Sequence, residues 1–148
     1  MKLSRLLVSS LLLVIAAHAS ARDDVLSFSI QEALATPDAV NILGTNVKFY
    51  FGDAQPTEKV LRTVGEYKTN RKTNAATKSD IDACQRAFIS TLISLRDSAK
   101  GAGANAVINI KSNYRNNTTS SNDTFQCGVG GIIAGVALVG DVVVLENQ

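Results

Sequence analysis

Several residue types that carry much of protein chemistry are scarce or absent in this chain of 148 residues, which has no tryptophan, one histidine and two cysteines. The single histidine, His18, lies in the N-terminal segment. The rest of the chain therefore has no imidazole for a Ser-His-Asp triad, a Cys-His pair or a metal site. Aromatic residues make up 5% of the sequence, too few for a platform that stacks nucleic-acid bases.

A charge excess of either sign is also lacking. The full chain has 15 basic and 13 acidic residues. Lys2 and Arg5 lie in the N-terminal segment, and without them the two signs are equal at 13 each. A balanced chain has no bulk attraction for nucleic acid or anionic lipid. We expect no nucleic-acid partner, and no membrane contact once that segment is removed.

The N-terminus does contain the pattern of a secretory signal peptide. Lys2 and Arg5 give a positive start, residues 6–17 form an apolar run, and Ala19 and Ala21 supply the small residues of a cleavage site. The run is short for a membrane span, although an uncleaved anchor is the alternative.

Cleavage after Ala21 would remove residues 1–21, and His18 with them, and leave residues 22–148 as one domain. We expect a periplasmic or secreted product.

Cys84 and Cys127 are the only cysteines. Two cysteines in a small exported domain usually pair, which predicts a structural disulfide. A free thiol pair and a redox site are the alternatives, but redox pairs usually read C-x-x-C. Paired thiols leave no thiolate for zinc, so we expect neither a metal site nor a cofactor.

The apolar pattern predicts one long helix. Ser79 suits its N-cap, and Gly101 or Gly103 would end it. Residues 22–43, broken by Pro37, predict a helical lead-in. The core-facing stripe of the long helix would consist of Ile81, Cys84, Phe88, Leu92, Leu95 and Ala99.

Alternating and apolar runs predict the strands, at residues 47–51, 60–72, 106–115, 125–129 and 136–145. Residues 70–78 and 116–123 have the composition of polar connectors. In the third strand, Ile108, Ile110 and Tyr114 should share one face. The whole pattern predicts an α+β domain in which one long helix packs on a small, mainly antiparallel sheet, with a helical N-terminal lead-in and one disulfide.

Two glycine motifs have a structural interpretation. Residues 101–106 contain a G-x-G-x-x-A string, but it follows a helix and precedes a strand, which predicts a tight turn rather than a nucleotide site. Gly131 and Gly135 form a G-x-x-x-G in an apolar stretch that Asp141 interrupts. We expect a glycine-kinked strand there, and the alternatives are membrane insertion and oligomer packing. Gly140 suggests a bulge in this strand.

The final strand is apolar on both faces, so it needs two covers. The long helix can cover one face, and residues 25–43 can cover the other. Otherwise the strand forms an interface with a second copy or a partner. The side chains of that candidate interface are Val136, Leu138, Val139, Val143 and Leu145.

Short motifs through the chain resemble a group of exported bacterial proteins labelled "excinuclease ATPase subunit". The motifs are F-Y-F-G at 49–52, N-R-K-T-N at 70–74, N-A-V-I-N-I-K-S at 105–112 and A-G-V-A-L-V-G at 134–140. The resemblance extends to the YbjQ-type heavy-metal-binding family and to the periplasmic domain of the Rcs envelope-stress sensor lipoprotein, and it implies their fold. The chain has no G-x-x-x-x-G-K-[ST] motif for the ATPase label.

These observations favour an exported, non-catalytic envelope protein, namely a protein-interaction or stress-related binding module that contacts another envelope protein or itself. A periplasmic protein that binds a small ligand or a metal is the alternative. An enzyme of an unfamiliar type is the third hypothesis, and we expect no enzyme.

Overall fold

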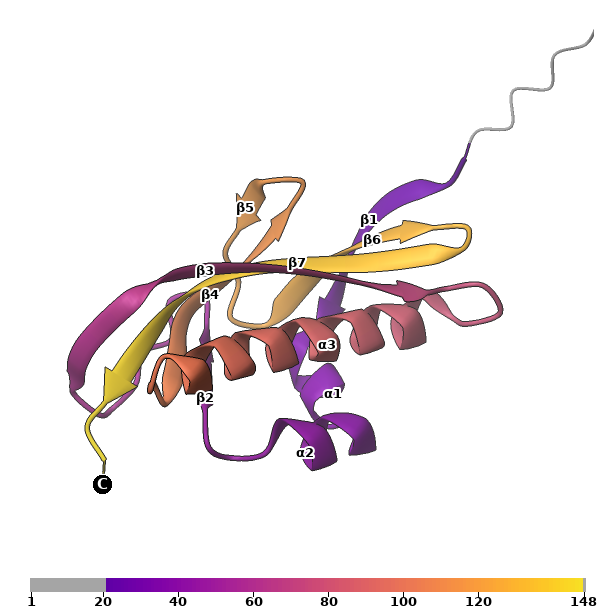
Figure 1. Ribbon diagram of the computed structural model, residues 1–148. Helices are drawn as coiled ribbons and strands as arrows, with labels where there is room; N and C mark the ends of the chain where they lie inside the picture. Colours follow the sequence, from indigo (N-terminus) through magenta and orange to yellow (C-terminus); the bar gives the residue numbers. More distant parts are fainter. Residues whose placement is uncertain (1–20, 148) are drawn as a thin grey trace, which may run out of the picture.

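The computed structural model describes residues 21–147 and combines a twisted sheet with helices on one of its faces (Figure 1). The helices of this part are α1 (Ile30–Leu34), α2 (Pro37–Leu43) and α3 (Asp80–Gly101). The strands are β1 (Asp23–Ser29), β2 (Lys48–Phe51), β3 (Val60–Asn74), β4 (Ala106–Tyr114), β5 (Asn117–Thr119), β6 (Thr124–Gly130) and β7 (Ile133–Leu145). The mixed class and the disulfide are confirmed, but the sheet of seven described strands is larger than the small sheet predicted.

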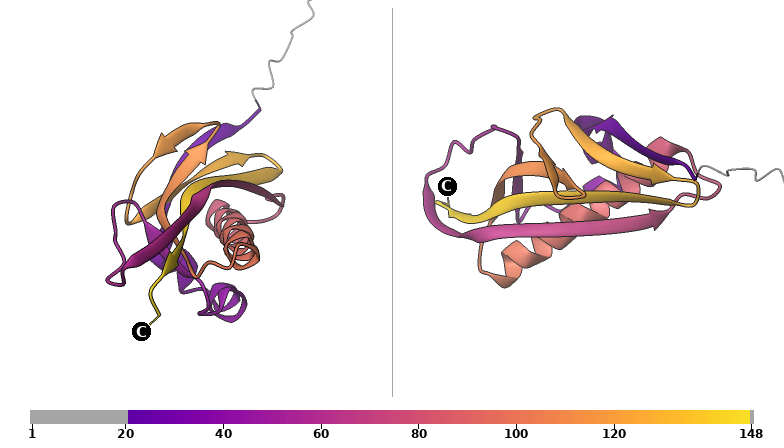
Figure 2. Two further views of the ribbon diagram at one scale, coloured as in Figure 1. Left: turned by 60° about the vertical axis from the view of Figure 1, so that its left-hand side comes forward. Right: turned by 90° about the horizontal axis from the view of Figure 1, so that it is seen from above.

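β7 is the central strand. One of its edges pairs antiparallel with β3 over almost the full length of both strands. Its other edge pairs with β6 near Ala134 and with β4 between Leu138 and Val143. β1 extends the sheet beyond β6, and β2 adds a parallel edge beyond β4. Figure 2 shows the long β3–β7 ribbon crossing over α3.

α3 begins and ends where the sequence predicts. The Ser79 hydroxyl accepts a hydrogen bond from the backbone N–H of Asp82 at 3.2 Å and donates one to its carboxylate at 2.7 Å, which caps the helix. The helix ends at Gly101, and Gly103, with a φ of +68°, turns the chain toward β4. The glycine string at 101–106 is therefore the predicted turn from helix to strand.

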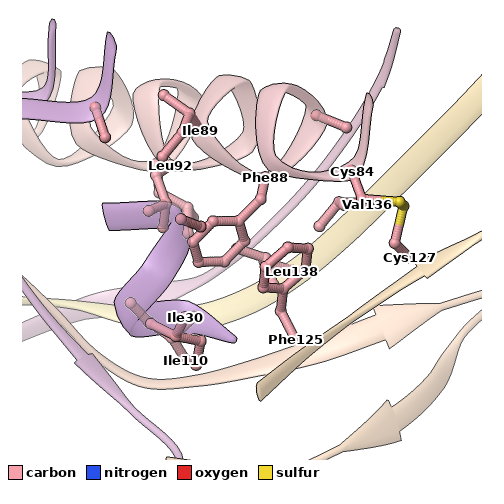
Figure 3. Packing of buried hydrophobic residues seen from close by; sticks show 14 of the residues in the cluster. Ile30, Cys84, Phe88, Ile89, Leu92, Ile110, Phe125, Cys127, Val136 and Leu138 are labelled. Carbon is pink, nitrogen blue, oxygen red and sulfur yellow. A yellow bond between two sulfur atoms is a disulfide. The ribbon is translucent and has the colours of Figure 1, made fainter. Parts of the chain in front are cut away.

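One stripe of α3 supplies the centre of the core (Figure 3). The rings of Phe88 and Phe125 stack with their centroids 4.1 Å apart, and Phe51 lies 5.9 Å from Phe88. Every residue of the predicted stripe is fully buried except Ile81, which is 40% exposed because the first helical turn lies at one end of the molecule.

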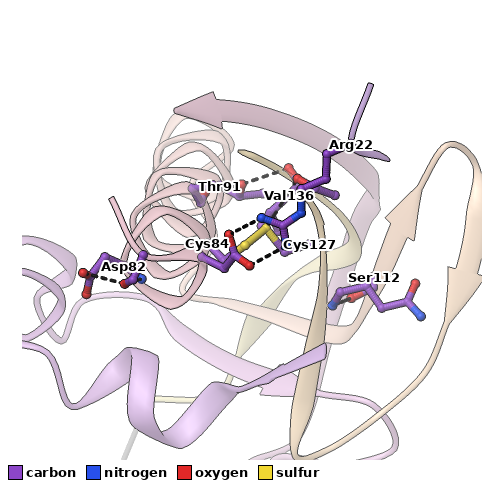
Figure 4. Close-up of a disulfide and its surroundings, with 12 residues drawn as sticks. Arg22, Asp82, Cys84, Thr91, Ser112, Cys127 and Val136 are labelled. Carbon is purple, nitrogen blue, oxygen red and sulfur yellow. Dashed lines mark hydrogen bonds and ion pairs between the residues drawn. A yellow bond between two sulfur atoms is a disulfide. The ribbon is translucent and has the colours of Figure 1, made fainter. Parts of the chain in front are cut away.

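The predicted disulfide joins the start of α3 to β6 (Figure 4). Cys84 and Cys127 are fully buried, with their Cα atoms 5.9 Å apart. Two turns further along α3, the hydroxyl of Thr91 lies 2.7 Å from the carbonyl oxygen of Ala87 and 3.2 Å from that of Val136. The helix is thus tied covalently to β6 and by a buried hydrogen bond to β7.

The N-terminal lead-in differs from the helical prediction. Its first part is β1, which pairs antiparallel with β6 along its whole length. Helix begins only after Ser29, whose side chain caps α1, and Thr36 caps α2 in the same way. The helical prediction was wrong over β1 because it rested on the helix-forming residues at 29–35, which follow that strand. Within β1, Leu26 and Phe28 pack against the core with the two-residue period of a strand.

A β-bulge in β4 overturns the predicted face of one side chain. Register passes from Ile108–Asp141 to Lys111–Val139, so that Asn109 and Ile110 both lie opposite Gly140. Asn109 has a φ of +52°, which inserts the extra residue. Ile110 consequently joins the main core, whereas Ile108 faces the other side of the sheet. The bulge lies on the partner strand, not in β7 itself.

Two polar segments also form strands that were predicted as connectors. β3 continues to Asn74, so residues 70–74 pair with β7. Asn117–Thr119 form β5 against the end of β4. Both are edge strands, whose side chains remain polar because they meet water, and polarity therefore hid the pairing.

Candidate functional site

A groove of about 440 Å³ runs along the outward side of α3, between α2 and the end of β3. Its apolar lining consists of Ile42, Ile89 and Ile93. Ile89 is buried at 5% exposure, whereas Ile42 remains 49% exposed on the groove wall. The groove thus presents an apolar floor that the described chain leaves open.

The position of α2 fixes the width of this groove. Arg96 of α3, whose side chain is 15% exposed, donates hydrogen bonds to the carbonyl oxygens of Ile42 and Leu43 at the end of α2. A cation at this position satisfies helix C-terminal carbonyl groups. Ala39 and Leu43 are buried beneath α2. The helix is therefore held at both its core face and its C-terminal end.

Charges of both signs surround the apolar floor. Its rim carries Asp38, Lys78, Asp82 and Arg86. Arg86 approaches Asp38 only to 4.0 Å, and both side chains are largely exposed, so this pair contributes little to stability. The rim can therefore rearrange its pairing toward an incoming charged group. The polar residues Thr36, Thr73, Gln85 and Ser90 complete the lining.

A second, more polar hollow of about 260 Å³ lies on the sheet face away from α3. Glu66 of β3 is directly opposite Asp141 of β7, and Lys68 and Lys111 flank Val139 in the next row. Two carboxylates at opposed positions repel each other. The side-chain amide of Asn109, carried there by the bulge, donates to the Asp141 carboxylate at 2.8 Å.

A carboxyl group with a strongly lowered pKa lies at the other end of the sheet. Glu58 bonds to the Lys48 ammonium group, and this hydrogen bond is the main reason that the pKa of Glu58 falls to about 2. The Glu58 side chain is 5% exposed. The Tyr50 hydroxyl lies 3.4 Å from a carboxylate oxygen of Glu58. Burial is the main reason that the pKa of Tyr50 is raised. This cluster clamps the β2–β3 connection, and Lys48 and Glu58 also border a small hollow of about 190 Å³.

The structure places the predicted site residues as follows. Cys84 and Cys127 are bonded. Ala21 is the first described residue and is exposed, whereas Ala19 and His18 lie outside the described residues. The described side chains contain no group of three or more His, Cys, Asp or Glu residues placed to hold a metal ion. Within residues 21–147, no helix is long and apolar enough to cross a membrane.

The five candidate interface residues of β7 are all buried within the chain. Val136 and Leu138 face α3 in the main core. Val143 and Leu145 belong to a small cluster on the other face. Val139 is 7% exposed and lies between Lys68 of β3 and Lys111 of β4.

The expected cover of the second face of β7 is also different. α1 and α2 pack with α3 on the same side of the sheet, and β1 lies beyond β6, so residues 25–43 do not form this cover. Tyr50, Ala106 and Ile108 pack with Val143 and Leu145 instead, since β4 pairs with β7 there and Ala106 lies directly opposite Val143. An interaction surface must therefore be sought away from β7.

Sequence reasoning missed the groove, although α3 carries a signal of it. Ile89 and Ile93 are four residues apart and lie off the core stripe, so they define a second apolar strip on the helix. The segment that forms the wall beside this strip, α2, was not predicted to pack on α3.

No protein-family model, no curated protein and no solved structure matches this chain.

Proposed function

We propose that this protein is an exported, non-catalytic binding module that holds an extended peptide segment of another envelope protein in the groove between α2 and β3. The observation that carries the proposal is the apolar lining of Ile42, Ile89 and Ile93, of which Ile42 is 49% exposed, inside a rim of mixed charge. Aliphatic side chains of a peptide would bury against this floor, and its charged groups would meet the rim. The signal pattern and the buried disulfide support an extracytoplasmic location.

Site-specific photocrosslinking in the producing cell tests this function. A photoreactive residue in place of Gln85, which lines the groove, should yield one dominant adduct whose peptide is identified by mass spectrometry. The same residue in place of the exposed Ser120, in the loop between β5 and β6, is the control. Equal adducts from the two positions would contradict a groove site.

The peptide identified in this way should then bind the purified protein in calorimetry. Ile42→Asp should weaken its affinity about tenfold or more, because a charge replaces apolar surface in the groove. Val40→Asp on the same helix is a matched control, since Val40 is 66% exposed but does not line the groove. If the two variants weaken binding equally, the groove is not the peptide site.

A small zwitterionic ligand on the polar sheet face is the second candidate. The specific observation in its favour is Asn109, a non-glycine residue in the left-handed region that reaches the Asp141 carboxylate. Lys68 and Lys111 could meet an anionic group, and Glu66 a cationic one. Calorimetry with free amino acids, compared between the original protein and Lys111→Gln, distinguishes this function from peptide binding.

A further inference from the structure

β3 has one edge to which no described strand pairs. Its partner within residues 21–147 is β7, and it lies at the border of the sheet, with α3 passing beneath it (Figure 2). From Glu66 to Asn74 the register with β7 is continuous, without the shifts that interrupt it between Val60 and Gly65. A regular strand at a sheet border presents a row of backbone groups to which another extended chain can bond.

Two side chains show which backbone groups of β3 point away from β7. Arg71 Nη1 donates a hydrogen bond to the carbonyl oxygen of Asn70 at 3.1 Å, and Lys78 Nζ donates one to that of Asn74 at 3.0 Å. Because consecutive residues of a strand direct their backbone groups to alternate edges, residues 68 and 72 belong to the same outward row. We call residues 68–74 the open edge.

The open edge borders the candidate groove. The Thr69 hydroxyl donates to the carbonyl oxygen of Thr91 in α3 at 3.4 Å, and Arg71 Nη2 donates to the Ser94 hydroxyl at 2.7 Å. Thr73, the next side chain on this face of β3, lines the groove. A strand added beside β3 would therefore turn every second side chain toward the groove, because side chains alternate between the two faces of a sheet.

The charge of the open edge favours an acidic partner. Between residues 67 and 74, β3 carries Lys68, Arg71 and Lys72 and no acidic residue. The residues of β7 that pair with this segment, 133–140, are uncharged. A chain that carries carboxylates would therefore meet cations that the sheet itself does not neutralise.

Nearby carboxylates leave this positive charge largely in place. Glu66 approaches Lys68 only to 3.9 Å, and both side chains are exposed. The described lysine ion pairs are those of Lys48 and Lys68, so Lys72 has no carboxylate partner within residues 21–147. On the adjoining groove rim the two signs are equal, with Asp38, Lys78, Asp82 and Arg86.

A second copy of this chain fits the open edge less well than an acidic peptide does. Pairing of two copies through this segment would bring two basic strands together, and like charges at opposed positions of a sheet repel each other. Lysine on an edge strand is a common guard against such pairing. The same lysines attract a strand of opposite charge.

We propose that the peptide of the proposed function binds to the open edge as an added β-strand and that it alternates apolar with acidic side chains. Its apolar side chains turn toward Thr73 and the groove, and its carboxylates meet Lys68 and Lys72 on the other face of the sheet. Its backbone N–H groups replace the exposed hydrogen bonds of Arg71 and Lys78 to the edge carbonyl groups. The inference rests on the proposed function and adds the chemistry of the peptide and its mode of binding.

Two synthetic peptides test the chemistry of the partner by calorimetry. One has about eight residues that alternate valine with glutamate, and the other has lysine in place of each glutamate. The glutamate peptide should bind about tenfold or more tightly than the lysine peptide. Equal or tighter binding of the lysine peptide, or no binding of either, would overturn the proposal.

Lys72→Gln locates the charge effect on the protein. It should weaken binding of the glutamate peptide about two- to fivefold, because one cross-strand charge pair is lost. Lys100→Gln is the matched control, since Lys100 lies in the last turn of α3 and should not contact the peptide. Equal effects of the two substitutions would contradict binding at the open edge.

Methylation of the peptide backbone tests the added strand itself and leaves the protein unaltered. In a paired strand the amides of one alternating set of residues face β3, whereas those of the other set face solvent. Methylation of all glutamate amides or of all valine amides should therefore weaken binding about tenfold or more in one peptide and little in the other. Equal losses, or no loss in either peptide, would overturn the added strand.

Amide hydrogen exchange gives a further measurement on the protein. The outward N–H groups of Asn70 and Lys72 should exchange about tenfold or more slowly when the glutamate peptide is bound, because they become hydrogen-bonded. Those of Arg71 and Thr73, which alternation directs toward β7, should change much less. Unchanged exchange at Asn70 and Lys72 in the bound protein would also overturn the proposal.

Failure of this inference can be separated from failure of the proposed function. A peptide captured at Gln85 that carries no acidic residue, or whose two methylated forms bind equally, rejects the open edge and retains the groove. A glutamate peptide that pairs with β3, but that Ile42→Asp and Val40→Asp weaken equally, rejects the groove and retains the open edge.

Discussion

At the scale of single residues, Gly140 shows how tightly the central strand packs. A Cβ added there would lie 2.8 Å from Val107 Cγ1 and 3.1 Å from Ile110 Cγ1, with the carbonyl oxygen of Ile108 at 3.3 Å. The backbone oxygen and two buried side chains cannot all withdraw. We therefore expect Gly140→Ala to lower the free energy of unfolding by about 1–3 kcal/mol, measured by urea denaturation.

Gly131→Ala is the matched control for this prediction. Gly131 lies in the β6–β7 turn, and a Cβ there would have no neighbour within 4 Å. Its free energy of unfolding should change by less than about 0.5 kcal/mol. A loss as large as that of Gly140→Ala would mean that backbone freedom, and not packing, governs both positions.

The disulfide is the second feature at this scale. Cys84 and Cys127 are 43 residues apart in sequence, and a cross-link closing such a loop restricts the unfolded chain. Cys84→Ala should lower the free energy of unfolding by about 2–4 kcal/mol in urea denaturation.

Reductant provides the control for the disulfide. It should lower the urea midpoint of the original protein toward that of Cys84→Ala and leave the midpoint of the variant unchanged. A midpoint of the original protein that does not respond to reduction would contradict a stabilising role.

At the scale of elements, sequence period predicted the elements that are regular and failed where one residue alters the period. The long helix was predicted to begin at Ser79 and to end at Gly101 or Gly103, and α3 spans Asp80–Gly101 because capping and apolar spacing agree there. The face of Ile108 was predicted wrongly, because Asn109 adds one residue to β4. Nothing in the sequence pattern distinguishes Asn109 from its polar neighbours. β1 was missed because its pairing with β6 joins segments about a hundred residues apart.

The connection between β2 and β3 gives a pH-dependent prediction. The pKa of Glu58 is lowered from 4.5 to about 2, chiefly by its hydrogen bond to Lys48. A lowered carboxyl pKa stabilises the folded state fully above the unfolded value, and this stability is lost as pH falls toward the folded value. The melting temperature of the original protein should therefore fall more between about pH 5 and pH 2 than the melting temperature of Glu58→Gln does.

Glu66→Gln is the comparison for the acid limb. Glu66 is an exposed partner of Lys68 at 3.9 Å, so its removal should leave the acid dependence nearly unchanged. An identical acid dependence in the original protein and in Glu58→Gln would show that the Lys48–Glu58 pair does not contribute.

At the scale of the whole molecule, the candidate groove could not be predicted from the sequence. The groove requires α2 to lie beside α3, so that Ile42 of one helix lines the same cavity as Ile89 and Ile93 of the other. What sequence did indicate was chemistry that needs no such contact, namely the signal pattern and a pair of cysteines. The burial of β7 between its own neighbours also could not be predicted, because it depends on which strands pair beside it.

Processing is a property of the whole chain. The exported protein should begin at Arg22, since Ala19 and Ala21 form the expected cleavage site. Intact-mass spectrometry measures this directly. Ala21→Leu should retain residues 1–21, because the cleavage site requires a small residue there, whereas an unchanged mass loss in that variant would place the site elsewhere.

The position of β7 at the centre of the sheet, and last among its strands in sequence, has a consequence for biogenesis. β3 has no described partner other than β7, and β4 and β6 also meet through it. Because a chain emerges from its N-terminus, the earlier strands leave the ribosome or an export channel before the strand that joins them. The sheet can close only after residue 145 has emerged, so the native fold cannot form before the last strand of the sheet has been made.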